Sequence, residues 1–107
     1  MAQKKIYFKD EFVEPVEEGV KTSIVTPYFD GKVGDLVEAR SNLSTVKRCF
    51  GRLRIKGVTY IRFDDIDKNI ARTEGYLHEN LLKAELLRTY PDLEDSSLLY
   101  YVVFEWR

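Results

Sequence analysis

The chain is organised around residues 19–26, which read Gly19-Val20-Lys21-Thr22-Ser23-Ile24-Val25-Thr26. Glycine often ends a helix, and the alternation of polar and apolar residues after Lys21 is typical of a strand. A lysine and hydroxyl groups at such a junction form either the floor of a pocket for a polar ligand or an ordinary solvated turn. The spacing alone favours the turn, so the choice depends on the residues on either side.

A short helix is expected before this stretch and several strands after it. The apolar residues at positions 12, 13 and 16 share one helical face, and Pro15 places the regular start near Glu14. Strands are predicted for residues 4–8, 21–26, 36–40, 46–55, 58–63 and 98–106, with a bend at Gly51 and a turn or bulge at Lys56-Gly57. Helices are predicted through residues 66–71, capped by Asp64 or Asp65, and over 78–90. This order predicts an α+β fold, a small β-barrel of five to six strands with two or three flanking helices.

Composition limits the class of protein. With 107 residues, 44% hydrophobic and 33% charged, the chain has the composition of one soluble globular domain. It has no apolar run of the ~20 residues that a membrane span needs. It also lacks a signal-peptide pattern, and the single Cys49 cannot form an internal disulfide, so a cytoplasmic location is expected. A net charge of −1 excludes a strongly basic protein held to nucleic acid by bulk charge, but not a local basic patch. The oligomeric state stays open.

The sequence lacks the motifs of zinc sites, catalytic triads and nucleotide-binding loops. One His78 and one Cys49 do not make a zinc set, and a catalytic triad would have to use His78, which is expected at a helix start. No glycine-rich loop has the spacing of a P-loop or a dinucleotide fingerprint. We therefore expect no metal and no cofactor.

The predicted strand 46–55 carries a basic face. Arg48, Arg52 and Arg54 alternate along it, with Phe50 among them. Arginines contact phosphates and an aromatic ring stacks on a base, so this face is a possible contact for single-stranded RNA. A solvated strand face whose arginines pair with nearby acids fits the pattern equally well.

Lys21 and Glu74 are the other candidates. If the turn before the second strand and the turn between the last two helices converge, an amine and a carboxylate meet over a cavity. Burial there would lower the pKa of the lysine and raise the pKa of the carboxyl group. One would then act as a base or nucleophile and the other as an acid.

A longer pattern resembles the ASCH domain family. It comprises Phe8/Phe12, Gly19-Val20-Lys21-Thr22, Gly34-Asp35-Leu36, Ala71-x-x-Glu74, Tyr90-Pro91 and Tyr101-Val102-Val103-Phe104. Within that family the chain is most similar to the compact bacterial N4-acetylcytidine amidohydrolases. The resemblance covers nearly the whole chain and implies a PUA-like fold, a small β-barrel with flanking helices, for residues 1–107 as a single domain.

The resemblance also implies an activity, deacetylation of N4-acetylcytidine or a related acylated nucleoside. In those enzymes the motif runs Gly-x-Lys-Thr-x-Thr-x-Arg, and the lysine, the second threonine and a later glutamate carry the hydrolysis. The lysine and the glutamate match Lys21 and Glu74, whereas Ile24 and Thr26 stand at the second threonine and the arginine.

The two departures from the motif leave the role of the hydroxyl groups open. Thr22, Ser23 and Thr26 are expected to bind the substrate, and a local bulge in the strand would let Ser23 or Thr26 substitute for the missing threonine. The alternative is a non-catalytic module that binds RNA or a nucleotide.

Overall fold

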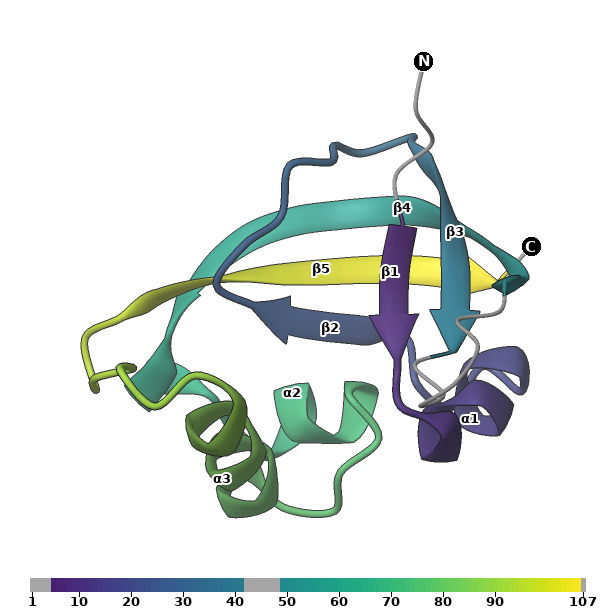
Figure 1. The fold of residues 1–107 in the computed structure, drawn as a ribbon. Coiled ribbons are helices and arrows are strands. Elements are labelled where there is room, and N and C mark those ends of the chain that lie inside the picture. The colour runs from purple at the N-terminus through teal and green to yellow at the C-terminus, as the bar shows by residue number, and fades with distance from the viewer. Residues whose placement is uncertain (1–4, 42–48, 107) are drawn as a thin grey trace.

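The computed structural model describes residues 5–41 and 49–106, which form one strongly curved sheet with helices on one side (Figure 1). The elements are β1 (Lys5–Phe8), the 3-10 turn η1 (Asp10–Phe12), α1 (Val13–Glu17), β2 (Ser23–Thr26), β3 (Leu36–Ser41), β4 (Cys49–Arg62), the 3-10 turn η2 (Phe63–Asp65), α2 (Lys68–Thr73), α3 (Glu79–Thr89) and β5 (Leu98–Trp106). The strand order is β1-β3-β4-β5-β2, with β1 parallel to β3 and the other pairs antiparallel. The predicted α+β fold, a small curled barrel with flanking helices, is confirmed.

The long strand β4 makes the sheet curl. Its first half pairs with β3 and its second half with β5, and a register shift at Lys56 separates Ile55 from Gly57. The residues predicted as two strands therefore form one strand with a bulge, which bends without breaking. A second shift lies opposite Ala39 and Arg40.

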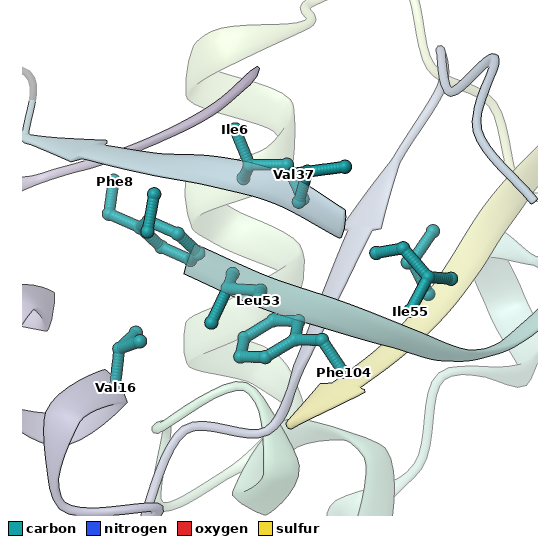
Figure 2. Packing of buried hydrophobic residues seen from close by; sticks show 9 residues of the cluster. Ile6, Phe8, Val16, Val37, Leu53, Ile55 and Phe104 are labelled. Carbon is teal, nitrogen blue, oxygen red and sulfur yellow. The ribbon is translucent and has the colours of Figure 1, made fainter. Parts of the chain in front are cut away.

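The main core fills the inside of the curl. Ile6 and Phe8 of β1 pack in one buried cluster with Leu53 of β4, Phe104 of β5 and Val16 of α1 (Figure 2). Ile24 of β2 packs against the same cluster. The two edge strands, at opposite ends of the strand order, thus face one another across a shared core. The fold is a half-barrel, and the side between β1 and β2 is its open seam.

A second core holds α2 and α3 against the sheet. Val25 and Leu99 of the sheet are buried with Ala71 of α2 and with Leu82 and Leu86 of α3. None of the helices in residues 5–41 and 49–106 is long and apolar enough to cross a membrane.

The cap of α2 differs from the prediction. Asp67 caps the helix, and its carboxylate accepts a hydrogen bond from the Ile70 amide at 2.9 Å. Asp64 and Asp65 lie in η2 instead. The predicted caps were wrong because an extra turn precedes the helix.

Candidate functional site

Backbone hydrogen bonds fix Lys21 between α1 and β2. Gly19 follows α1 with a φ of 76°, as a predicted helix end requires, and the amides of Val20 and Lys21 both donate to the Pro15 carbonyl, at 2.9 and 3.0 Å. The next residue, Thr22, is anchored on both sides, because its amide donates to Thr73 and its carbonyl accepts from Phe104. These bonds turn the Lys21 side chain inward, and only 4% of it is exposed.

Glu74 reaches the same place from the end of α2. It is the C-terminal cap residue, and Gly75 follows with a φ of 92°. The Tyr76 amide then donates to the Ala71 carbonyl at 2.8 Å, which closes the helix end. Glu74 is also 4% exposed.

The structure brings Lys21 and Glu74 into direct contact. The Lys21 ammonium donates to the Glu74 carboxylate and, at 2.7 Å, to the Glu74 backbone carbonyl. The other carboxylate oxygen accepts a hydrogen bond from the Val25 amide. The Phe12 ring lies 4.8 Å from the Lys21 nitrogen, within the range of a cation–π contact. Two turns 53 residues apart therefore converge on one amine–carboxylate pair.

Burial shifts the two groups in opposite directions. Loss of water lowers the pKa of Lys21, and the attraction of Glu74 opposes this only in part. Loss of water likewise raises the pKa of Glu74, against the effects of Lys21 and the Val25 amide. Both shifts favour the uncharged forms, so the energy gap between the ion pair and an amine beside a carboxylic acid is narrower than in water. A pair of this kind can exchange a proton internally, as acid–base catalysis requires.

The pair lies at a cavity of about 160 Å³ beside the open seam. Its lining comprises Tyr7, Phe8, Lys9, Phe12, Lys21, Ile24, Val25, Glu74, Tyr76, Leu82, Glu85, Leu86, Thr89 and Tyr90. An adjoining hollow of about 330 Å³ shares four of these residues: Tyr7, Ile24, Val25 and Tyr90. The walls are mainly aromatic and aliphatic, which suits a flat organic ligand with few polar groups.

The three hydroxyl groups expected to bind substrate do not line this cavity. Ser23 is fully buried, and its hydroxyl bonds Thr73 at 2.7 Å, which in turn bonds Tyr101 at 2.9 Å. Thr26 lines the adjoining hollow, where its hydroxyl bonds the Tyr28 carbonyl at 3.2 Å. Thr22 borders neither space. Ser23 shares a face of β2 with Val25, which does line the cavity, but the Ser23 hydroxyl is held by Thr73 of α2.

The structure adds residues that sequence reasoning missed. Tyr76 lines the cavity with its ring tilted against Phe12, the ring centroids 5.5 Å apart. Lys9 and Glu85 form an ion pair on the cavity wall, and Arg88 also binds Glu85, at 2.6 Å. The only sequence signal for Tyr76 was its position just after Glu74 and a helix-ending glycine.

The basic strand face is separate from the cavity. Arg48 lies outside the described residues, and Arg52 and Arg54 line neither the cavity nor the hollow. Across the sheet these two arginines stand opposite Glu38 and Glu105.

Phe50 does not share the arginines' surroundings. Phe50 is the extra residue of the bulge opposite Ala39 and Arg40. Because of this bulge its side chain lies on the opposite face of the sheet from the one that strict alternation predicts. Its ring stacks on Trp106, with centroids 5.7 Å apart and planes 18° apart, and meets the edge of Phe8 at 6.0 Å.

In the ranges that the structure covers, no cluster of three His, Cys, Asp or Glu side chains could hold a metal ion.

Comparisons with known proteins identify the fold. No known family model matches the chain, and no curated protein matches it. A crystal structure of a protein from Enterococcus faecalis V583, described under the family DUF984, is similar with a TM-score of 0.74 and 18% identity, over 99% of this chain and 81% of that one. A crystal structure of an ASCH domain from Lactobacillus crispatus JV V101 is similar with a TM-score of 0.70 and 15% identity, over 98% of this chain and 79% of that one. The chain therefore has the fold of ASCH domains, as its sequence pattern predicted.

Proposed function

We propose that the protein hydrolyses the amide of N4-acetylcytidine or of a closely related acylated nucleoside. The observation that carries the proposal is the Lys21–Glu74 pair, buried side by side at one cavity. Amide hydrolysis needs a base for water and an acid for the leaving nitrogen. The pair supplies both in a site where burial has already brought the two protonation states closer together.

The reaction begins from the uncharged pair. The Lys21 amine takes one proton from a water molecule, and the remaining hydroxide oxygen forms a bond to the acetyl carbon. The C–N bond then breaks, its electron pair passes to the cytosine N4 nitrogen, and that nitrogen receives the proton of the Glu74 carboxylic acid. The products are cytidine and acetic acid. Transfer of the proton gained by Lys21 to Glu74 restores the starting pair.

The shape of the cavity supports this substrate class. Phe8, Phe12 and Tyr76 give it aromatic walls that suit a pyrimidine ring. In our proposal the acylated base enters the cavity and the sugar lies in the adjoining hollow, beside Tyr7 and Tyr90.

The test is release of cytidine from N4-acetylcytidine, followed by chromatography. We expect turnover by the wild-type protein and none above background for Lys21→Ala. Lys68→Ala is a matched control, because Lys68 is an exposed residue at the start of α2. Glu74→Gln keeps the shape of the side chain but cannot donate the proton, so kcat should fall by about 10²–10⁴-fold. Absence of wild-type turnover on a panel of acylated nucleosides would refute the proposal.

One observation favours a second candidate, a non-catalytic module that binds a nucleotide or RNA. The cavity wall carries the apolar Ile24 where the similar enzymes have a threonine. Such a module would bind N4-acetylcytidine or cytidine without converting it. If the ligand is single-stranded RNA, binding should weaken with salt and weaken again when Arg52 and Arg54 are neutralised.

A further inference from the structure

Addition of water to an amide creates a negative charge on the acyl oxygen. Enzymes stabilise this charge with hydrogen-bond donors that are already in position before the reaction. In the proposed reaction Lys21 and Glu74 are occupied with the water and the leaving nitrogen. A further donor must therefore face the same cavity.

Four of the residues that line the cavity carry a side-chain hydroxyl group: Tyr7, Tyr76, Thr89 and Tyr90. The Thr89 hydroxyl donates to the Glu85 carbonyl of its own helix at 3.1 Å. Tyr7 and Tyr90 are 46% and 38% exposed, and both also border the adjoining hollow. Tyr7 and Tyr90 are thus shared between the two spaces, whereas Tyr76 lines the cavity and not the hollow.

The turn at Gly75 places Tyr76 beside the reacting groups. A Cβ atom at Gly75 would lie 3.3 Å from the Phe12 ring and 3.9 Å from the Lys21 Cβ atom, so this turn packs directly on Lys21. Glu74 and Tyr76, on either side of the glycine, both line the cavity. The Phe12 ring supports both Lys21 and Tyr76, and this contact limits the movement of the phenol.

Burial and the neighbouring carboxylates keep the proton on the Tyr76 hydroxyl. Burial, together with the carboxylates of Glu85, Glu74 and Glu11, raises the pKa of Tyr76 to about 12. The phenol therefore keeps its proton near neutral pH and can donate a hydrogen bond there. The same residues make it a poor candidate for a base.

We propose that Tyr76 is a further catalytic residue, whose hydroxyl donates a hydrogen bond to the acyl oxygen of the substrate as water adds. This inference rests on the proposed amide hydrolysis. The phenol keeps its proton throughout, so that the bonds made and broken are those already given. The donor comes from the turn after α2 rather than from β2. This position accounts for an apolar Ile24 where similar enzymes carry a hydroxyl.

The first experiment compares Tyr76→Phe with the wild type on N4-acetylcytidine. Phenylalanine keeps the ring contact with Phe12 and removes only the donor. We expect kcat to fall by about 10²–10³-fold, as for loss of one oxyanion donor, with little change in KM and in the melting temperature. Tyr60→Phe is the matched control, because Tyr60 is an exposed residue of β4 that does not line the cavity. A kcat of Tyr76→Phe within threefold of wild type would overturn the assignment.

A second experiment separates a chemical role from a structural one. The substitution Ile24→Thr introduces a hydroxyl group on β2, across the cavity from the turn that carries Tyr76. It is made both in the wild type and in Tyr76→Phe. We expect a gain in kcat of at least tenfold in Tyr76→Phe and a much smaller gain in the wild type, because either hydroxyl can serve one oxygen. Equal gains in both backgrounds would contradict a shared role. Wild-type protein that leaves all acylated nucleosides intact overturns the hydrolysis itself, whereas active wild type with active Tyr76→Phe overturns only the role of Tyr76.

Discussion

Replacement of Lys21 by methionine should make the stability of the protein depend on pH. Methionine fills a similar space but leaves the Glu74 carboxyl group buried, and within residues 5–41 and 49–106 the Val25 amide is its remaining hydrogen-bond partner. Burial already raises the pKa of Glu74 above its ordinary value of 4.5, and the variant removes the two Lys21 effects that oppose the rise. The folded variant therefore retains a proton that the unfolded chain releases as pH rises.

The difference in proton binding between the folded and unfolded states sets the sign and the size of the change in the free energy of unfolding. The free energy of unfolding should be least affected well below pH 4.5, where Glu74 is protonated in both states. It should then fall by about 1.4 kcal/mol per pH unit until the folded carboxyl ionises, and level off above that point. Breaking a buried pair by removal of one partner costs about 3–5 kcal/mol, which is the loss expected on the upper plateau.

Urea unfolding from pH 5 to pH 8 measures this loss. Trp106 is the single tryptophan, and its stacking on Phe50 makes its fluorescence a probe of the folded sheet. The double variant Lys21→Met/Glu74→Gln is the control, because it has no carboxyl group left to titrate. It should be more stable than Lys21→Met at pH 8. An equal loss of stability at pH 5 and pH 8 in Lys21→Met would refute the reasoning.

Three further substitutions test the surroundings of the site. Gly51→Ala should cost about 1–3 kcal/mol in urea unfolding, because the new methyl group would lie 2.0 Å from the Trp106 ring; unchanged stability would contradict this packing. Ser23→Ala should cost about 1 kcal/mol through its buried hydrogen bond to Thr73, and a raised KM would instead show that Ser23 binds substrate. Asp67→Ala removes the cap of α2 and should cost about 1 kcal/mol, with Asp65→Ala as the neutral comparison.

Local patterns in the sequence predicted most of the framework. Helix and strand signals correctly placed three features: the glycine after α1, the hydrophobic run of β5 and the cap positions of α3. Lys21 and Glu74 were selected because their turns could meet, and the structure joins them. The predictions of helix ends and strands succeeded because each depends on a few neighbouring residues, whereas the Lys21–Glu74 contact joins residues 53 apart and rested on the condition that two turns converge.

The failures concern the direction of side chains and the continuity of β4. Lys56-Gly57 fits a turn and a bulge equally, and only pairing with β5 selects the bulge. The bulge at Phe50 reverses its direction, which alternation cannot foresee. Alternation places Ser23 and Ile24 on opposite faces of β2, but Val25, on the face of Ser23, lines the cavity beside Ile24, so alternation alone does not select the lining residues.

The open seam gives this site a mechanical consequence. Edge strands β1 and β2 contain four residues each, and residues from both line the cavity and the adjoining hollow. A molecule bound there would contact both edge strands and so connect the two ends of the sheet. Ligand present at a hundred times its Kd stabilises a protein by about 2.7 kcal/mol. Here the ligand would stabilise β1 and β2, the two shortest strands described, against local opening. Hydrogen exchange of the amides in both strands would then slow by a similar factor when the ligand binds.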